Sequence, residues 1–236
     1  NWFDLLDPVH PSQHRIAPAN GNKPHGIAFW GHYVVHGGND ATLGLYDYYS
    51  GVRSLSHVTG VNPLNAGAQP PFEFRTTKGY IVDSNEMAIT RFDPDDPSGG
   101  IVTTEFADLS AVGFKIGSCH PIGNLLVCTA SKAKGVATFD ISDPLRPNLV
   151  YARANVGNNV YTSMVYGSKL YACESGQGIR VYDFSDPRNV RETGFLPLKA
   201  SAGYNPRYVT IKDGKGYVAS GVIQTQEPKL VEGRTV

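Results

Sequence analysis

Histidine is the residue type with the widest chemical range in this chain, because its imidazole binds metal ions and transfers protons near neutral pH. The chain has seven histidines. His10 and His14 are four residues apart, but they lie in a proline-rich segment and so do not share a helical face. His32 and His36 would share one face of a strand, yet no His-Glu-x-x-His motif or closely spaced cysteine pair accompanies them. We therefore predict satisfied or exposed histidines and no metal site.

Aspartates are the second candidates. Asp93, Asp95 and Asp96 lie close together, as the oxygen ligands of a calcium loop do. However, the EF-hand spacing and its closing Glu are absent from the sequence. Asp-Pro and Ser-Asp-Pro are ordinary beginnings of turns, in which the carboxylate accepts hydrogen bonds from nearby backbone N–H groups. We predict turn capping and not calcium binding for these residues and for the other aspartates that anchor the repeats described below: Asp4, Asp47, Asp140 and Asp183.

The three cysteines are too few for a disulfide framework, and they do not by themselves indicate a compartment. Cys119 precedes His120 but lacks the upstream cysteine that haem attachment needs. Cys128 and Cys173 are flanked by apolar residues, which is typical of small buried side chains and not of redox thiols. Cys119 can face Cys128 across a hairpin at 120–127, and the sequence leaves both a bridge and two free thiols open.

Sequence motifs of enzyme nucleophiles and nucleotide sites are absent. The chain has no Gly-x-Ser-x-Gly elbow, no P-loop and no dinucleotide fingerprint. Gly176-Gln177-Gly178 predicts a hairpin turn. We therefore predict no catalytic residues and no cofactor.

The aspartates also mark a repeated phrase, in which an apolar alternating run ends at an Asp. The phrase leads into a Ser-Asp-Pro turn at 135–147 and again at 178–190. Related phrases lie at 2–11, 42–48 and 88–97, so the anchoring residues are 43 to 47 positions apart: Asp4, Asp47, Asp93, Asp140 and Asp183. A fixed period of this length indicates a repeat architecture.

Each repeat predicts four strands. The clearest copy has strands at 160–166, 169–174, 179–183 and 192–196, with period-2 alternation and glycine turns between them. Four strands in about 45 residues is typical of a propeller blade, whereas a sandwich would not repeat its turns at constant spacing and a β-helix would use shorter coils. We predict an all-β propeller of four-stranded antiparallel blades, about five in this chain, with inner strands that begin near Gly26, Phe72, Phe114, Val160 and Tyr208.

The two ends of the chain allow two accounts of the ring. No Asp-anchored strand follows Ser220, whereas Trp2–Pro11 is an extra copy of that phrase. In one account residues 1–11 complete the last blade and cover its edge. In the other, the chain is part of a larger propeller with further blades on either side. We predict a propeller over 1–223 and a polar C-terminal tail or linker over 224–236.

The phrases at 136–144 and 179–187 resemble the LVIVD repeat, an apolar strand that ends in Asp and continues as Ile/Val-Ser-Asn/Asp-Pro. Residues 79–84, 169–174 and 216–220 resemble its second-strand signature. The resemblance covers most of the chain up to about Val222 and is weakest in the first repeat, where no Ser-Asp-Pro turn follows Asp47. It implies a β-propeller of the kind found in exported or surface proteins of bacteria and archaea, with no catalytic residues.

Composition narrows the class of partner. The chain has 21 Lys+Arg and 21 Asp+Glu, and no basic stripe is visible, so we do not expect a nucleic acid partner. No apolar run approaches the roughly 20 residues that span a bilayer. The chain begins at Asn1, which we interpret as a mature or partial product from which any signal peptide is already gone.

The starts of the inner strands are the candidate site, because in a propeller they surround the axis at one mouth. Alignment on the hairpin glycine places these residues at equivalent positions: His25, Pro71 or Phe72, Gly117, Tyr161 and Tyr208, with Arg207 beside the last. Such a ring can bind a small anionic or aromatic ligand, or a loop of a partner. The competing interpretation is that these side chains simply fill the channel.

The function predicted from these observations is a non-enzymatic binding or assembly module of an exported or cell-surface complex. Its partners would be other proteins or further copies of the chain. The first alternative is an enzyme domain with a metal or small ligand in the axial channel near His25, Tyr161 and Tyr208. The second is a structural subunit of a filament or shell, with the tail from Gln224 to Val236 as an arm that reaches a neighbour.

Overall fold

The computed structural model describes fourteen stretches of the chain, and every regular element in them is a strand. The described residues are 2–4, 12–14, 24–38, 42–50, 53–66, 74–77, 79–84, 87–92, 103–131, 133–157, 159–198, 204–222, 230–231 and 234–235. This part of the chain contains no helix long and apolar enough to cross a membrane.

Four antiparallel sheets of four strands follow one another along the chain, and in each of them neighbours in sequence are neighbours in space. They are blade 1 with β3 (Pro24–Trp30), β4 (Tyr33–Gly38), β5 (Thr42–Asp47) and β6 (Arg53–Val58); blade 2 with β7 (Phe74–Thr77), β8 (Tyr80–Asp83), β9 (Ala88–Arg91) and β10 (Thr103–Phe106); blade 3 with β11 (Ile116–Ile122), β12 (Leu125–Ala130), β13 (Gly135–Asp140) and β14 (Asn148–Ala154); and blade 4 with β15 (Val160–Tyr166), β16 (Lys169–Glu174), β17 (Gly178–Asp183) and β18 (Arg191–Pro197). Blade 5 is the hairpin of β19 (Tyr204–Lys212) and β20 (Lys215–Val222).

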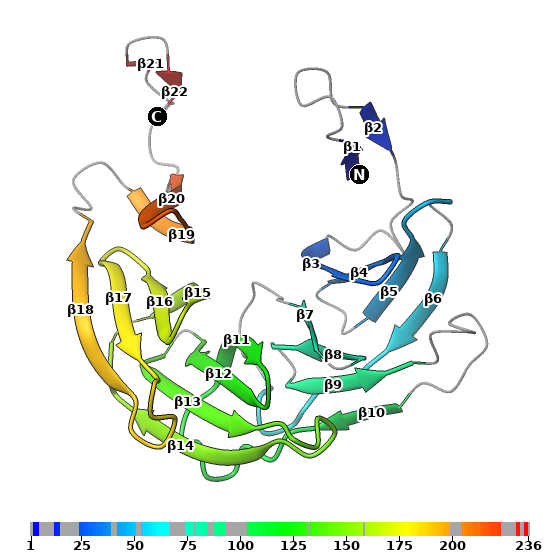
Figure 1. Cartoon of the computed structure of the whole chain (residues 1–236), viewed down its shortest axis with the longest axis horizontal. Helices are drawn as coiled ribbons and strands as arrows, with labels where there is room; N and C mark the ends of the chain where they lie inside the picture. The colour runs from blue at the N-terminus through cyan, green and yellow to red at the C-terminus, as the bar shows by residue number, and fades with distance from the viewer. Residues whose placement is uncertain are drawn as a thin grey trace.

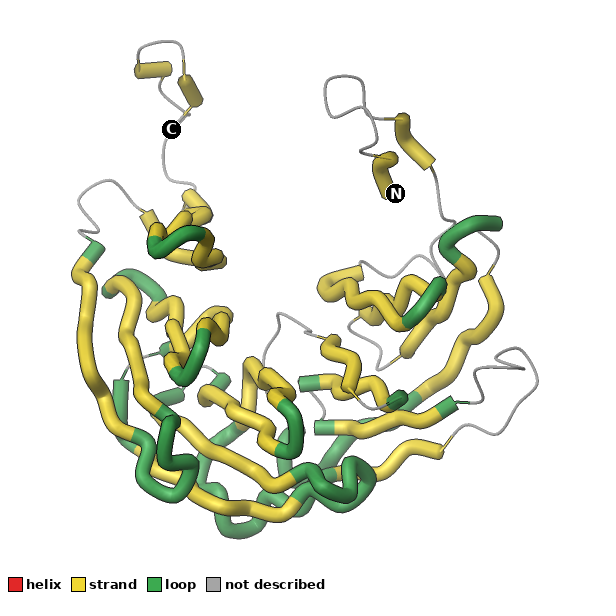
Figure 2. The backbone as a smooth tube through the Cα atoms, viewed as in Figure 1, coloured by secondary structure: helices red, strands yellow, loops and turns green. Residues whose placement is uncertain are grey.

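The blades stand side by side in an arc, with the first strand of each on the inner side and the fourth on the outer side (Figure 1). Blades 1 and 5 face each other across the opening of the arc (Figure 2). The prediction of a propeller with four-stranded antiparallel blades is confirmed. The number of blades differs slightly from the predicted five, since four are complete and the fifth has two strands among the described residues.

The ends of the chain form two small hairpins of their own. β1 (Trp2–Asp4) pairs with β2 (Ser12–His14), so the described strand of the predicted closing segment pairs locally and not with β20. Residues 5–11 lie outside the described residues, and the completion of blade 5 by residues 1–11 therefore stays a prediction. Within the predicted tail, β21 (Leu230–Val231) pairs with β22 (Arg234–Thr235).

The anchoring aspartates end the third strands, and they cap the turns that follow. The Oδ1 atom of Asp140 accepts a hydrogen bond of 2.8 Å from the backbone N of Ser142, and Asp183 accepts one of 2.8 Å from Ser185. Asp47 accepts hydrogen bonds from the two backbone N–H groups at 49 and 50. Turn capping is confirmed for these three residues, whereas residues 93–96 lie outside the described ones.

The core consists of apolar layers between successive blades, because side chains alternate across each strand. In β12, Leu126 and Cys128 belong to the layer shared with blade 2, while Val127 belongs to the layer shared with blade 4. Tyr33 and Phe92 help to fill the layer between blades 1 and 2, and a smaller layer between blades 4 and 5 contains Val209. A blade inside the arc is therefore buried on both faces.

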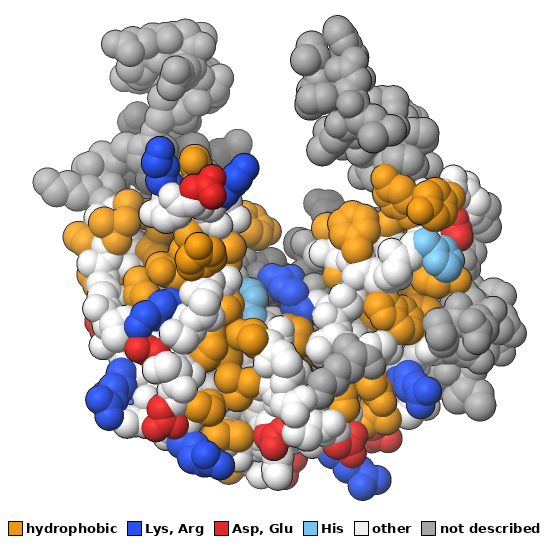
Figure 3. Space-filling model, in the orientation of Figure 1, with side chains coloured by type: hydrophobic (Ala, Val, Ile, Leu, Met, Phe, Trp, Pro, Cys, Tyr) orange, Lys and Arg blue, Asp and Glu red, His pale blue; other side chains and the backbone are white. Residues whose placement is uncertain are grey.

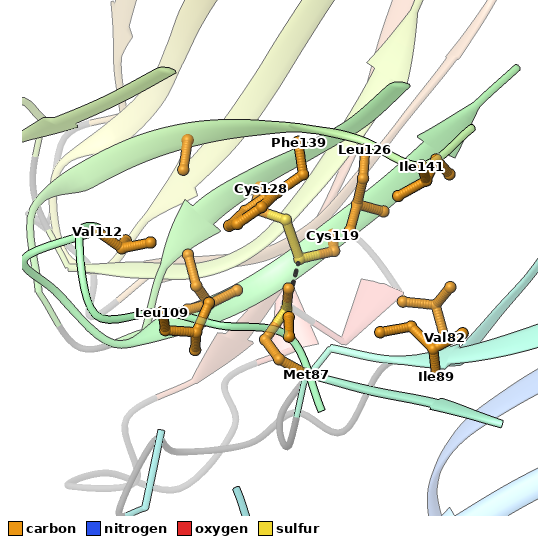
Figure 4. Packing of buried hydrophobic residues seen from close by; sticks show 13 residues of the cluster. Val82, Met87, Ile89, Leu109, Val112, Cys119, Leu126, Cys128, Phe139 and Ile141 are labelled. Carbon is orange, nitrogen blue, oxygen red and sulfur yellow. Dashed lines mark hydrogen bonds between the residues drawn. A yellow bond between two sulfur atoms is a disulfide. The ribbon is translucent and has the colours of Figure 1, made fainter. Parts of the chain in front are cut away.

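A disulfide joins Cys119 of β11 to Cys128 of β12, which decides the question that the sequence leaves open. The two residues are direct partners in the strand register, with Cα atoms 4.1 Å apart, and both are fully buried. The bridge lies in the layer between blades 2 and 3, where the Cys119 sulfur is 3.5 Å from the Met87 sulfur (Figure 4). A disulfide sulfur has no proton to donate, so we interpret this as a packing contact. Cys173 is buried and is not part of a disulfide.

A count of thiols tests the bridge. We expect alkylation of the unfolded, unreduced chain to modify one cysteine and alkylation after reduction to modify all three. Because the bridge closes a short loop, its reduction should lower the free energy of unfolding by about 2–3 kcal/mol. Mass spectrometry and urea titration measure the two effects. Modification of three thiols before reduction would contradict the assignment.

The turn that precedes β17 requires glycine at its end. Gly178 has a φ of 152°, and a Cβ at this position would lie 2.1 Å from the carbonyl oxygen of Leu196 in β18. We expect Gly178→Ala to lower the free energy of unfolding by about 1–3 kcal/mol, measured by urea titration. Gly216→Ala is the matched control, because a Cβ there meets nothing within 4 Å, and its effect should stay within about 0.5 kcal/mol. Equal effects of the two substitutions would contradict this account.

Candidate functional site

The inner strands β3, β7, β11, β15 and β19 surround the axis of the arc (Figure 1). Threonine side chains connect neighbouring inner strands. The hydroxyl of Thr76 in β7 donates a 2.8 Å hydrogen bond to the carbonyl oxygen of Phe29 in β3. The hydroxyl of Thr162 in β15 likewise donates a hydrogen bond to the carbonyl oxygen of Arg207 in β19. These contacts hold the strand backbones of adjacent blades at close range, so side chains from different repeats can converge at the axis.

Four of the inner strands contain a register shift near their beginning, each with one extra residue opposite the second strand of the blade. The extra residues are His25, Gly117, Tyr161 and Arg207. A β-bulge re-aims side chains and is often found beside functional sites. The predicted mouth therefore coincides with a row of bulges.

The register corrects one of the predicted equivalences. Arg207, and not Tyr208, occupies the position of Tyr161. The alignment on the hairpin glycine was one residue off because glycine is the first turn residue in the hairpin at Gly167 but the second in the hairpin of blade 5, where Asp213 precedes Gly214. Both residues of the latter turn have positive φ, of 51° and 71°, as a type I′ turn requires.

The structure brings two of the four predicted residues into contact. The guanidinium carbon of Arg207 lies 3.7 Å from the centre of the Tyr161 ring, in a cation–π arrangement, and both side chains are half-buried. Tyr208 follows in the chain and is 52% exposed. His25 belongs to β3, across the opening of the arc from β19, and its side chain lies outside the described ones (Figure 1). Residues 71 and 72 also lie outside them.

Further along the inner strands, three polar side chains form a network between blades 3 and 4. The Oγ atom of Ser163 lies 2.9 Å from Nε2 of His120 and donates a 2.8 Å hydrogen bond to Oγ of Ser118. The backbone N–H of Ser163 also donates to Oγ of Ser118, at 3.2 Å. All three side chains are buried, so these bonds satisfy polar groups that would otherwise be costly at this interface.

The pKa of His120 is lowered to about 3, chiefly by burial and also by the positive charge of Arg75, while a hydrogen bond with the Ser163 backbone acts in the opposite direction. His120 is consequently neutral at physiological pH. A neutral imidazole can share hydrogen bonds with serine hydroxyls, but a base with so low a pKa is poorly matched to proton transfer near pH 7. The network is therefore suited to holding two blades together and not to activating a serine.

A cavity of about 470 Å³ opens at the axis beside this network. Inner strands of four blades contribute its walls, which consist of Ile27, Ala28, Phe29, Arg75, Thr76, His120, Pro121, Ile122 and Val165. In the space-filling view, a histidine and a basic side chain lie together at the centre of the arc, with hydrophobic atoms on both sides (Figure 3). The described walls of the cavity combine apolar side chains with the hydroxyl of Thr76, the imidazole of His120 and the guanidinium of Arg75.

Sequence reasoning did not find Arg75 and His120, although a signal was present. Counted back from the hairpin turn, the two residues hold equivalent places, opposite Val82 and Val127 of the second strands. The same place is taken by Ala28, Met164 and Thr210 in the other blades. The predicted site comprised only the starts of the inner strands, whereas Arg75 and His120 lie closer to the hairpin turns at their other ends.

A second charged cluster lies in blade 4. Glu174 is fully buried, and its carboxylate binds the guanidinium of Arg180 through contacts of 2.6 and 3.0 Å. Arg180 also reaches Glu192 of β18 at 2.6 Å, and a Cβ on Gly157 would come within 2.5 Å of the Glu174 carboxylate. The side chains of this network satisfy one another, which indicates a role in joining β16, β17 and β18.

The structure shows no group of three or more His, Cys, Asp or Glu side chains that could hold a metal ion within the stretches it describes. His32 lies 3.5 Å from the carboxylate of Asp47, and His57 hydrogen bonds to Thr104 at 2.9 Å, so these two histidines have the polar partners predicted for them.

The chain is similar in fold to solved β-propellers. BamB from Moraxella catarrhalis is 10% identical, with a TM-score of 0.56, over 90% of this chain and 60% of that one. A putative 6-phosphogluconolactonase from Bacteroides fragilis NCTC 9343 is 16% identical, with a TM-score of 0.61, over 84% and 63%. The β-propeller domain of Myceliophteria thermophila Cps50 (Swd1) is 11% identical, with a TM-score of 0.59, over 85% and 66%.

These identities show the fold alone. The chain spans 60 to 66% of the length of these three solved propellers. No protein-family model and no curated protein matches the sequence. The resemblance to the LVIVD repeat therefore stays a prediction.

The low pKa of His120 predicts a pH dependence of stability. The ordinary value is 6.5 and the folded value about 3, so between these limits the unfolded chain binds a proton that the folded protein does not. The free energy of unfolding should therefore fall below pH 6.5, by at most roughly 1.4 kcal/mol per pH unit from this one group. His120→Gln keeps a donor for Ser163 and should flatten this dependence in urea titrations at pH 7.5, 6 and 5. Parallel curves for the two proteins would contradict the assignment.

Proposed function

We propose that this protein is an exported, non-enzymatic binding or assembly module of the LVIVD-repeat type, which contacts a protein partner through the mouth of the propeller at Tyr161, Arg207 and Tyr208. The β-propeller fold and its WD40-like neighbours fit a binding or assembly module. The partner is a different protein or another copy of the chain, in a cell-surface or other multi-protein complex.

The observation that carries the proposal is the arginine–tyrosine stack at the bulges. Arg207 is held over Tyr161 at 3.7 Å, and Tyr208 beside it is 52% exposed. Tyrosine and arginine are, with tryptophan, the residue types enriched in binding hot spots, because each offers a large surface together with hydrogen-bond donors. A preformed stack also reduces the side-chain entropy that is lost on binding.

The disulfide supports the proposed export. Cys119 and Cys128 are bonded inside the core, and disulfides persist mainly in oxidising compartments such as the periplasm, the cell surface and the extracellular space. The formal net charge of +0 supports a protein partner in preference to nucleic acid.

A second candidate is an enzyme domain with a small ligand in the axial channel. The cavity beside Arg75 and His120 supports the binding of a small ligand, which this candidate requires. It does not support a reaction on that ligand. The residues first named for it lie elsewhere, since Tyr161 stacks on Arg207 and Tyr208 is exposed at the mouth.

Site-specific photo-cross-linking tests the proposed contact surface. A benzophenone amino acid at position 208 is expected to form one adduct of defined mass, either with a protein from an exported-protein extract or with a second copy of the chain. The same group at Asn148, an exposed position at the start of the outer strand β14, is the control and should form none.

The cross-link should weaken at least tenfold in yield when Arg207→Glu is introduced, since charge reversal removes the cation from the ring of Tyr161. Equal adducts from both positions, or an adduct that is indifferent to Arg207→Glu, would reject the mouth as the contact surface.

A further inference from the structure

The second strand of blade 5 differs from its counterparts in the other blades. In blades 3 and 4 these counterparts, β12 and β16, each lie between a first and a third strand and are buried at most positions. In blade 5, β20 pairs only with β19 among the described residues, and residues 215–219 are all exposed. The backbone N–H and C=O groups along such an edge form a template for a further strand.

The hairpin of β1 and β2 has the register of the outer half of a blade. In blades 3 and 4 the aspartate that ends the third strand pairs with the residue eight positions later, in the fourth strand. Asp4 pairs with Ser12 at the same separation. An aromatic residue precedes the aspartate in all three strands: Phe3, Phe139 and Tyr182. The hairpin therefore corresponds to strands three and four of a blade, and β19–β20 corresponds to strands one and two.

The register of the complete blades also predicts how the two halves would pair. In blades 1, 3 and 4 the anchoring aspartate lies opposite the first residue of the second strand. Aromatic pairs and opposite charges directly across an antiparallel ladder are stabilising, and an aromatic ring can cover a glycine on the neighbouring strand. The same register in blade 5 gives pairs of these kinds: Trp2 with Tyr217, Phe3 with Gly216 and Asp4 with Lys215.

The charged pair of this register is already formed in blade 4. The Nζ atom of Lys169 donates a 2.6 Å hydrogen bond to the carboxylate of Asp183. Lys215 holds the place of Lys169 in blade 5, because each is the first residue of the second strand and pairs across the hairpin turn. Lys215 is exposed, so its charge is available to the aspartate of an added third strand.

The apolar layer between blades 4 and 5 lacks the contribution of a third strand. In the layers between the other blades, the aromatic residue near the end of the third strand packs toward the preceding blade and is fully buried: Phe92, Phe139 and Tyr182. Leu196 of β18 lies opposite Ile179, a member of the layer between blades 4 and 5, and is 55% exposed. An added third strand would bring an aromatic side chain to this apolar surface.

The arc determines which copy of the hairpin can reach β20. The hairpin lies on the blade 1 side of the opening, away from β20 (Figure 1). To reach β20 of its own chain it would need the opening to close, and the closely packed layers that set the angle between blades would have to shift. The hairpin of a second copy can reach the same edge without this change.

We propose that the edge of β20 binds the β1–β2 hairpin of a second copy of the chain, which completes blade 5 as a four-stranded sheet and joins copies head to tail. Addition of strands to an exposed edge is an established mode of recognition, and a head-to-tail contact uses different surfaces on the two copies. The proposal goes beyond the proposed function, because its surface is the edge of β20 and not the mouth of the propeller.

Disulfide trapping in a mixture of two variants tests the proposal. Trp2→Cys and Tyr217→Cys chains, mixed in a glutathione buffer, should form a mixed dimer that exceeds either homodimer by about tenfold or more, because the predicted register places positions 2 and 217 within disulfide reach. The dimers differ in mass and are resolved by intact mass spectrometry. Val218→Cys is the matched control, since the adjacent side chain leaves the opposite face of the strand, and its yield with Trp2→Cys should be much lower.

Charge reversal separates the predicted register from a nonspecific contact. Lys215→Glu in the Tyr217→Cys chain should lower the yield of mixed dimer by about fivefold, and so should Asp4→Lys in the Trp2→Cys chain. The two reversals together should restore it. Lys134→Glu, the same change at an exposed position between β12 and β13, should leave the yield unchanged.

Mixed dimers and homodimers in random proportions would overturn the proposal, and so would a double reversal that restores nothing. A chain that carries both Trp2→Cys and Tyr217→Cys distinguishes closure within one copy. If it forms an intramolecular disulfide as a monomer, the occupant is the hairpin of the same chain and the proposal is wrong. Arg207→Glu should not alter the mixed dimer, whereas it should weaken the cross-link at position 208, so the two proposals can fail separately.

Discussion

Burial of both faces of each inner blade is the constraint on which the rest of this structure depends. A strand in blade 3 must offer apolar side chains alternately to blade 2 and to blade 4, as Leu126 and Val127 do. The third strand of that blade, β13, is consequently buried at every residue but the last. The one charged residue of β13 is accordingly its last, Asp140, which caps the turn that follows.

Packing of one blade on the next also brings residues that are about one repeat apart in the sequence into contact near the axis. Thr76 hydrogen bonds to the residue 47 positions before it, Ser163 to the residue 45 positions before it, and Thr162 to the residue 45 positions after it. Each bond joins the same part of two successive inner strands. Because the strands converge there, one side chain from each repeat is enough to build a continuous polar or apolar lining. A functional site in such a fold needs no sequence motif, since its members are about one repeat apart.

The two candidate regions of the axis differ in physical character. At the bulges an exposed tyrosine adjoins an arginine that is stacked on a second ring, which is a surface suited to a protein. Around Arg75 and His120 the surface is concave and combines polar with apolar side chains, and its volume of about 470 Å³ lies within the range of small-molecule sites. The buried network of Ser118, His120 and Ser163 lies between blades 3 and 4 next to the cavity, and it holds the His120 imidazole that forms part of the cavity wall.

The sequence by itself determined the class of fold, the four strands of blades 1 to 4, the aspartate-capped turns and the place of the inner strands, because period-2 alternation and turn chemistry are local properties that repeat. Only the tertiary structure decided that Cys119 bonds to Cys128, that Arg207 and not Tyr208 is the partner of Tyr161, and that Arg75 and His120 share a cavity. Each of these depends on strand register or on the distance between blades. A shift of one residue in a turn changes the register without changing the pattern, so side-chain contacts between repeats follow from packing and cannot be derived from periodicity alone.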